Sequence, residues 1–191
     1  MLSRPTTERG LTRRLGKRIA AVGRALGMKV LVAARKPSSN PLPGHARDKL
    51  SAPDADDGRV PFDEVLRQAT VVVLSLPRNP QTLNLLSAVE FEMMHPYALL
   101  INIARGGIVD EAAVVQALKE KRIAGYATDV YQVEPAGGPK DTPLLGEDAK
   151  DLNITLSPHL AWFSQRTIEN LGEILKATVE AALKGEDVNI V

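Results

Sequence analysis

The sequence contains no cysteine among its 191 residues. This absence excludes disulfide scaffolds, thiolate zinc sites and catalytic thiols, and it is consistent with a reducing compartment. Long apolar runs are also absent. None approaches the roughly 18 residues that a membrane-spanning helix needs, which excludes an integral membrane protein. Hydrophobic residues make up 44% and charged residues 25%, so the chain has the composition of a globular domain with a sizeable core.

The net charge of +1 hides an asymmetry along the chain. Residues 1–36 carry ten Lys or Arg and one acid, Glu8, whereas the other 155 residues carry 14 bases and 22 acids. A basic, acid-poor N-terminus is typical of a mitochondrial transit peptide, a nucleic-acid-binding arm or a solvated helix face that also attracts a phosphate. We favour the helix face and expect no nucleic-acid partner. Apolar residues recur there at helical spacing: Leu15, Ile19, Val22 and Leu26. Without a targeting signal, we expect a cytoplasmic location.

The hydrophobic pattern predicts an alternation of helices and strands. Helices are expected over 15–26, over 63–69, after a capping box of Ser87 and Glu90, from Asp110 to Lys121, and from Ser164 to about Lys184. Strands are expected over 29–34, 70–76, 98–104, 123–131 and 152–157. Because these strands are apolar on both faces and separated by helices, they predict an α/β fold with a doubly wound parallel sheet.

Ligands of such sheets bind beyond the carboxyl ends of the strands. Arg105 follows one expected strand, Asp129 and Glu134 follow the next, and His159 follows the last. An arginine binds a carboxylate through two parallel hydrogen bonds, an imidazole transfers protons near neutral pH, and a carboxylate beside the imidazole would orient it. Taken singly, each residue is more often structural: a hydrogen-bonding histidine, an arginine in a surface ion pair, a glutamate in a turn.

Two further histidines, His45 and His95, have no sequence neighbours that indicate a metal site or catalysis. We therefore expect no metal.

Taken together, the ordered motifs N-I-A-R-G-G-x-x-D-E, D-V-x-x-x-E-P and S-P-H-x-x-W resemble those of the D-isomer-specific 2-hydroxyacid dehydrogenases. The resemblance runs from about Gly16 to the last helix, and it is strongest to glycerate dehydrogenase and hydroxypyruvate reductase members, partly through Trp162. It implies that Arg105 binds the carboxylate and carbonyl of a small 2-keto acid, that His159 protonates the carbonyl oxygen, and that Glu134 orients His159.

The resemblance also implies a substrate, a cofactor and an assembly. Hydride would come from a nicotinamide cofactor. Hydroxypyruvate or glyoxylate is the favoured substrate, with a bulkier 2-keto acid of a biosynthetic pathway as the alternative, and a homodimer through the cofactor domain is possible. The residues that would line the cofactor are Gly16, Pro77, Thr82, Ile103, Ala104, Asp129 and Trp162.

One position indicates which nicotinamide cofactor is used. In NAD-binding members, the strand after the glycine-rich helix ends in an acid that binds the ribose hydroxyls. Here the expected strand ends in Ala34, and Arg35 and Lys36 follow. Two cations at this place suit the 2′-phosphate of NADP, so we favour NADPH over NADH. The alternative is that Arg35 and Lys36 only open a polar loop.

The resemblance fails at the N-terminus of the chain. Family members place a substrate-binding segment, a buried strand and a G-x-G-x-x-G fingerprint before the first helix. Here residues 1–9 are too polar for a central strand, and aligning Gly16 with the third glycine puts Leu11 and Arg13 at the first two. We expect 1–14 to be an atypical N-terminal segment, and 15–191 a Rossmann-like NAD(P)-binding domain with its first strand and most of the substrate-binding domain missing.

Three explanations for this atypical N-terminal segment stay open. The chain could be the truncated product of a full enzyme gene, an inactive relic that retains a nucleotide-binding fold, or a chain completed by a partner or a rearranged N-terminus. In each case the missing strand would lie mid-sheet in the usual 3-2-1-4-5-6 order, leaving its neighbours without a partner.

Overall fold

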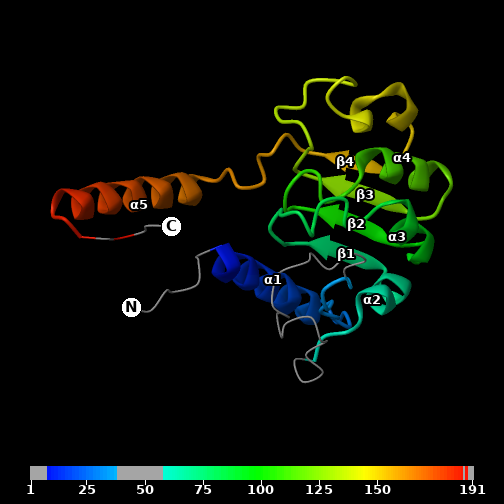
Figure 1. Cartoon of the computed structure of the whole chain (residues 1–191), viewed down its shortest axis with the longest axis horizontal. Coiled ribbons are helices and arrows are strands. Elements are labelled where there is room, and N and C mark those ends of the chain that lie inside the picture. The colour runs from blue at the N-terminus through cyan, green and yellow to red at the C-terminus, as the bar shows by residue number, and fades with distance from the viewer. Residues whose placement is uncertain (1–7, 38–57, 187, 189–191) are drawn as a thin grey trace, which may run out of the picture.

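The structure is a computed structural model of the chain, and it describes residues 8–37, 58–186 and 188, with side chains from residue 14 onward (Figure 1). The helices are α1 (Glu8–Ala25), α2 (Phe62–Gln68), α3 (Ala88–Met93), α4 (Glu111–Lys119) and α5 (Gln165–Leu183). The strands are β1 (Val71–Leu74), β2 (Leu99–Asn102), β3 (Gly125–Thr128) and β4 (Ile154–Leu156). Two short 3-10 helices, Pro143–Leu145 and Glu147–Ala149, precede β4.

The four strands form one parallel sheet in the order β1-β2-β3-β4. The register pairs Val71 with Leu99, Leu99 with Gly125, and Tyr126 with Ile154. Because all strands run the same way, their carboxyl ends lie along a single edge (Figure 1). The expected α/β fold with a parallel sheet is confirmed.

The core forms where the sheet meets its covering helices. Leu74 and Leu100 from the strands, Phe91 from α3 and Val114 from α4 are at most 5% exposed. Helix α3 packs against both α2 and α4. Burying one such side chain stabilises the fold by about 1.5–3 kcal/mol. This packing holds the ends of the strands, and with them the loops that follow, in position.

The expected helix starts are confirmed by their hydrogen bonds. Ser87 and Glu90 form the capping box of α3, with the Ser87 N–H donating to Glu90 Oε2 at 3.0 Å. Asp110 Oδ1 accepts from two backbone N–H groups at the start of α4, each at 3.0 Å. Ser164 Oγ accepts from the N–H of Thr167 at the start of α5. Each cap satisfies donors that the first helical turn leaves free.

The expected strand over 29–34 is wrong. Ala33 makes only an isolated parallel bridge with Val60, through the bonds from Ala34 N to Val60 O and from Val60 N to Val32 O. A strand needs a continuous partner, and within the described residues β1 is an edge that pairs only with β2. The segment therefore follows the strand direction without joining the four-stranded sheet.

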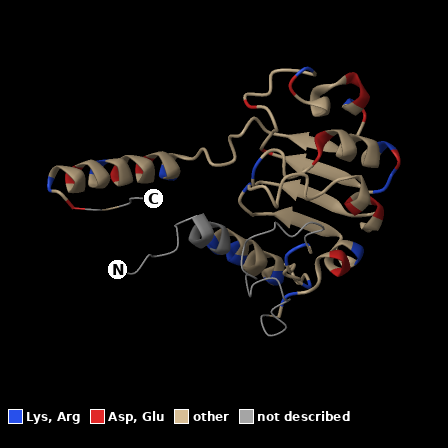
Figure 2. Cartoon of the chain, viewed as in Figure 1, with Lys and Arg blue, Asp and Glu red and all other residues tan. Residues whose placement is uncertain are grey.

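Helix α1 starts earlier than the expected residue 15, because residues 8–14 contain one glycine, Gly10, and otherwise mostly good helix formers. Its basic residues from Arg14 to Arg24 are exposed, and Figure 2 shows them along the helix beside β1. A Cβ atom on Gly16 would lie 3.3 Å from Ser75 Oγ, so α1 packs closely against the end of β1. The basic stretch is thus a solvated helix face over the part of it that the structure describes.

Helix α5 stands apart from the sheet (Figure 1). Its large apolar side chains are exposed, among them Leu171 at 51% and Leu175 at 66%, whereas Ala181 near its end is buried. Among the described helices, none is both long and apolar enough to cross a membrane.

Candidate active site

Glu134 and His159 come together at the carboxyl edge of the sheet although they are 25 positions apart. His159 Nδ1 lies 2.7 Å from Glu134 Oε2, and the other carboxylate oxygen accepts the backbone N–H of Tyr131 at 2.8 Å. The two side chains are 40% and 34% exposed, so the pair is fixed on one side and open to a ligand on the other. The geometry leaves the Nε2 atom of His159 free of the carboxylate.

Arg105 lies next to this pair, in the loop that follows β2. The buried amide of Asn102 shapes that loop, because its oxygen accepts from Ala104 N at 3.1 Å and its nitrogen donates to Arg105 O at 3.2 Å. The guanidinium of Arg105 is exposed and donates one bond to the Ala104 carbonyl at 2.7 Å. Its remaining donors can bind an anionic ligand.

The glycine after Arg105 brings two strand-end loops into contact. A Cβ atom on Gly106 would lie 1.7 Å from the carbonyl oxygen of Tyr131, a distance that no side chain can occupy. Gly107 has a φ of +75°, in the left-handed region, and the guanidinium of Arg78 lies 3.5 Å from where its Cβ would be. The R-G-G motif is therefore required by this close approach as well as by its arginine.

The local charges keep Glu134 ionised. Burial raises the pKa of Glu134, but the hydrogen bonds from the Tyr131 N–H and from His159, with the positive charges of His159 and Arg105, outweigh burial and lower it. The same result places Arg105 within electrostatic reach of Glu134. An ionised carboxylate at this distance stabilises a protonated imidazole, which is the form that donates a proton.

Asp129, directly after β3, contacts the turn that carries His159. It is buried, its Oδ1 accepts from Leu160 N at 2.9 Å, and its Oδ2 accepts from Ala161 N at 3.0 Å. The hydroxyl of Ser157 also donates to Oδ1. Burial raises the pKa of Asp129, but these three donors and the charge of His159 lower it below its usual value.

The other residues expected to line a cofactor are spread along the same edge. Gly16 lies beside the end of β1, Ile103 is half-buried and Ala104 buried after β2, and the loop after β1 is closed by the bond from Thr82 Oγ1 to Pro77 O at 2.9 Å. Trp162 is 45% exposed, and its indole N–H donates to the His159 carbonyl at 2.8 Å.

The two cations expected at a 2′-phosphate have different surroundings. Lys36 Nζ lies 2.6 Å from Oε1 of Glu90, a carboxylate whose side chain is 3% exposed. Arg35 is exposed, and no hydrogen bond or ion pair involves its side chain within the described residues. Arg35 is thus the cation that a ligand can reach without displacing a protein partner.

These residues fit the two ends of a nicotinamide dinucleotide better than its central pyrophosphate. The strand-end loops with His159, Arg105 and the half-buried Ile103 suit the nicotinamide and a substrate beside it, and Arg35 suits an adenosine 2′-phosphate. The backbone of α1 is already helical from Glu8 through the positions aligned with the glycine fingerprint. A pyrophosphate normally binds there against a glycine loop, so that part fits less well.

Sequence reasoning assigned no role to Glu111, which the structure shows to be buried under the site. Its Oε1 accepts from Gln132 N at 2.7 Å, and its Oε2 accepts from Thr142 Oγ1 at 2.6 Å. The carboxylate therefore ties α4 to both ends of the loop that carries Glu134. Its signal was its place as the last residue of the N-I-A-R-G-G-x-x-D-E motif.

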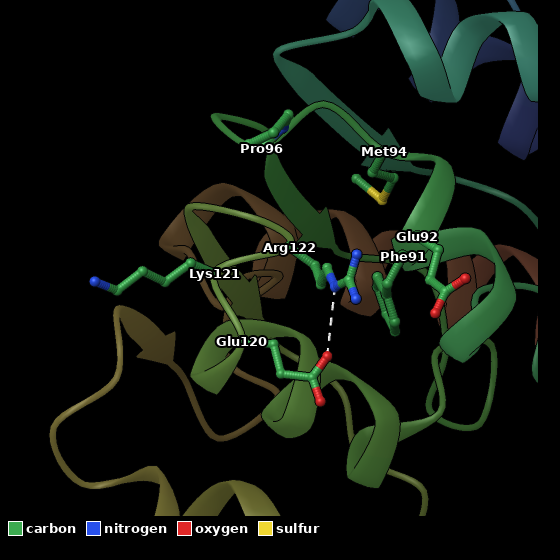
Figure 3. A pocket seen from close by; sticks show the side chains of 7 residues that line it. All are labelled: Phe91, Glu92, Met94, Pro96, Glu120, Lys121 and Arg122. Atoms are coloured by element: carbon green, nitrogen blue, oxygen red, sulfur yellow. Dashed lines mark hydrogen bonds and ion pairs between the residues drawn. The ribbon is translucent and has the colours of Figure 1, made fainter.

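A hollow of about 560 Å³ lies at the other edge of the sheet, away from these residues (Figure 3). It is lined by residues from the end of α3 and the end of α4: Phe91, Glu92, Met94, Pro96, Glu120, Lys121 and Arg122. Arg122 and Glu120 form an ion pair at 3.4 Å in the turn after α4, on one wall of the hollow. Because ligands of parallel α/β sheets bind at the carboxyl ends of the strands, this hollow is not the candidate site.

The parallel sheet and the strand-end positions of Arg105, Glu134 and His159 are those of a Rossmann-type domain. The chain belongs to the D-isomer specific 2-hydroxyacid dehydrogenase family, whose NAD binding domain model matches residues 12–161. This confirms the resemblance on which the site was predicted.

Among curated relatives, the chain is 39% identical over 177 residues to the glycerate dehydrogenase of Methylorubrum extorquens, covering 93% of this chain and 49% of that protein. It is 40% identical over 113 residues to the D-3-phosphoglycerate dehydrogenase of Escherichia coli K12, covering 58% of this chain and 27% of that protein. The chain thus spans about half or less of the length of these relatives.

Solved structures have the same fold. D-lactate dehydrogenase with NAD+ from Lactobacillus jensenii aligns with a TM-score of 0.71 at 26% identity, covering 92% of this chain and 52% of that one. An acyclic imino acid reductase in complex with NADPH and D-Arg aligns with a TM-score of 0.67 at 27% identity, covering 92% and 50%. A nicotinamide-binding fold is therefore established, and these relatives include both cofactor types.

Proposed function

We propose that this chain is the cofactor-binding part of a reductase that converts a small 2-keto acid, of the hydroxypyruvate or glyoxylate type, into a D-2-hydroxy acid. The observation that carries the proposal is the 2.7 Å contact between His159 Nδ1 and Glu134 Oε2 beside Arg105. The relative named glycerate dehydrogenase supports the substrate class. So does a glyoxylate reductase structure, which aligns at 28% identity with a TM-score of 0.68 and covers 91% of this chain and 48% of that one.

Each residue has one task in this reaction. The guanidinium of Arg105 donates to the substrate carboxylate and to the carbonyl oxygen, which fixes the carbonyl carbon in place. The Nε2 atom of His159 gives its proton to that oxygen, and Glu134 holds the imidazole through Nδ1 and stabilises its charge. A bound nicotinamide would supply the hydride to the carbon, so the carbonyl becomes a hydroxyl.

The cofactor is expected to be NADPH in preference to NADH. The expected ribose-binding acid is replaced by Ala34, and the next residue, Arg35, presents an exposed guanidinium that no side chain of the described residues pairs with. A planar guanidinium binds a phosphate through two parallel hydrogen bonds, whereas it offers little to a ribose hydroxyl that an acid would bind better.

A second candidate function is that of a domain that is active only when a second polypeptide binds to it. The exposed apolar residues of α5, such as Leu171 and Leu175, favour it, because large exposed apolar patches mark contact surfaces. A homodimer or another polypeptide could cover them. A bulkier 2-keto acid stays the alternative substrate.

The first test is oxidation of NADPH by this chain with hydroxypyruvate and with glyoxylate. Replacing the proton donor in His159→Gln is expected to lower kcat about a hundredfold or more while cofactor affinity holds. The matched control is His95→Gln, which changes a half-buried histidine after α3 and is expected to leave the rate unchanged. Cofactor binding without any keto-acid-dependent oxidation would favour the partner-dependent candidate, and equal rates in both variants would remove His159 from the mechanism.

A further inference from the structure

His159 has a backbone conformation that histidine rarely adopts. Its φ is +58°, in the left-handed region, where a residue with a Cβ atom is strained by about 1 kcal/mol or more. The local bonds of the turn run from His159 N to Ser157 O, from Trp162 Nε1 to His159 O and from Phe163 N to Leu160 O, and none of them requires a left-handed His159. Something outside the turn must hold it.

The carboxylate of Asp129 contacts the turn from outside at three donors. Other outside contacts are single bonds, from the Tyr131 hydroxyl to Ser157 O at 3.0 Å and between Glu134 and the His159 ring. The Asp129 carboxylate accepts the N–H of Leu160, the N–H of Ala161 and the hydroxyl of Ser157, which are the donors on either side of His159. These are charge-assisted bonds, about twice as strong as neutral ones. The three together fix the path of the chain through His159.

Asp129 is itself fixed to the sheet. Its N–H donates to the Asn102 carbonyl at 3.2 Å, continuing the pairing of β3 with β2, and its side chain is buried. The neighbouring Thr128 hydroxyl donates to the same Asn102 carbonyl and accepts from Val130 N. The Asp129 carboxylate therefore ties the turn after β4 to the end of β3, next to the bond from Ser157 N to Thr128 O at 3.0 Å.

We propose that Asp129 is a positioning residue for His159, and that the two carboxylates of the D-V-x-x-x-E-P motif divide the work. Asp129 fixes the backbone of His159 in its left-handed conformation, and Glu134 fixes the imidazole ring. The proposal rests on the proposed function in that His159 is the proton donor. The contact between Asp129 and the turn stands without that function.

This role limits what Asp129 offers a cofactor. A carboxylate has about four acceptor positions, two on each oxygen. Oδ1 accepts from Ser157 Oγ and Leu160 N, and Oδ2 accepts from Ala161 N, which leaves one position. A contact with a nicotinamide could use only that one, so holding the turn is the main task of the residue.

The test is Asp129→Asn in the 191-residue chain, followed by amide hydrogen exchange. Asparagine keeps the size of the side chain but puts an NH₂ group where one oxygen accepted an N–H. We expect exchange at Leu160 and Ala161 to rise about tenfold or more. The matched control is Asp110→Asn, since Asp110 also accepts two backbone N–H groups, at the start of α4. It should leave Leu160 and Ala161 unchanged.

Two spectroscopic signals separate positioning of His159 from a general loss of stability. The single tryptophan, Trp162, gives one indole N–H resonance, and it should shift when the His159 carbonyl moves. At a pH where the imidazole is neutral, long-range nitrogen spectra of His159 should change from a single Nδ1-protonated tautomer, held by Glu134, to a mixture of tautomers. The control should show neither change.

The outcomes are decisive in either direction. Faster exchange at Leu160 and Ala161 with the mixed tautomer supports the proposal, whether or not NADPH affinity also falls. Unchanged exchange with the tautomer retained overturns it, and a loss of NADPH affinity alone would then assign Asp129 to the cofactor. If Asp129→Asn does not fold, Ser157→Ala removes one of the three donors and must speed the same two amides, or the proposal is wrong. None of these readouts depends on turnover.

Discussion

Lys36 and Glu90 are 54 positions apart in the sequence, yet Lys36 Nζ lies 2.6 Å from Glu90 Oε1. The carboxylate belongs to the capping box of α3, where it also accepts from the N–H and the hydroxyl of Ser87. Burial raises the pKa of Glu90, but Lys36 and Ser87 lower it by more, so the buried carboxylate is ionised. The ammonium of Lys36 compensates a charge that would otherwise be costly to bury.

Lys36→Met is therefore expected to destabilise the chain. It leaves Glu90 with its Ser87 bonds but without its counter-charge, which should lower the free energy of unfolding by about 1–2 kcal/mol. Urea unfolding measures this. The matched control is Lys150→Met, which removes an exposed pair with Glu147 and should change stability by less than about 0.5 kcal/mol. Equal effects in the two variants would contradict a structural role for Lys36.

Arg35→Ala is expected to change cofactor preference without changing stability. Losing a guanidinium that binds the 2′-phosphate should weaken NADPH binding about tenfold or more and leave NADH binding nearly unchanged. Titration of each cofactor with the purified chain gives the ratio of the two affinities. Lys36→Met should leave that ratio as it is, because Lys36 is held by Glu90. An unchanged ratio in Arg35→Ala would overturn the proposed contact of Arg35 with a 2′-phosphate.

Gly106→Ala is expected to disrupt the site. The added methyl group would lie 1.7 Å from the Tyr131 carbonyl, so the loops after β2 and β3 must move apart. We expect a loss of about 3 kcal/mol or more in the free energy of unfolding, and a displaced Arg105. Gly138→Ala is the matched control, because no atom lies within 4 Å of its Cβ position. It should be neutral or stabilising by up to about 1 kcal/mol, and similar unfolding of both variants would refute the close approach.

Acidic pH is expected to destabilise the fold, because several carboxyl groups have a lowered pKa in the folded state. Glu90, Asp129 and Glu134 each have a pKa below the usual value. A carboxyl with a lower pKa in the folded than in the unfolded state binds fewer protons when folded. It therefore stabilises above the unfolded pKa of about 4, and this stabilisation is lost as pH falls through the folded pKa.

Urea unfolding across pH tests this expectation. The free energy of unfolding should hold down to about pH 5 and decrease steadily below about pH 4. Asp129→Asn should lower stability at pH 7 and make the decrease shallower, because one of the three groups no longer titrates. If the free energy of unfolding falls as steeply below pH 4 in Asp129→Asn as in the parent chain, Asp129 does not contribute to the pH dependence.

The sequence by itself determined the alternation of elements, the caps and the family. Ser87 with Glu90, Asp110 and Ser164 act within one helical turn, so their hydrogen bonds follow from spacing of a few residues. The strands of the sheet followed from short runs that are apolar on both faces. The order of the motifs placed Arg105, Glu134 and His159 after successive strands of a parallel sheet, which is enough to bring them to one edge.

Only the tertiary structure decided what those residues touch. The isolated bridge of Ala33 with Val60, in place of a strand over 29–34, depends on which edges are available for pairing. The partner of Lys36, the donors that surround Asp129 and the contact of Gly106 with Tyr131 join residues from different elements. Such contacts depend on sheet register and loop paths, which local spacing does not encode. They distinguish Lys36, which is paired with Glu90, from Arg35, which is exposed and unpaired among the described residues.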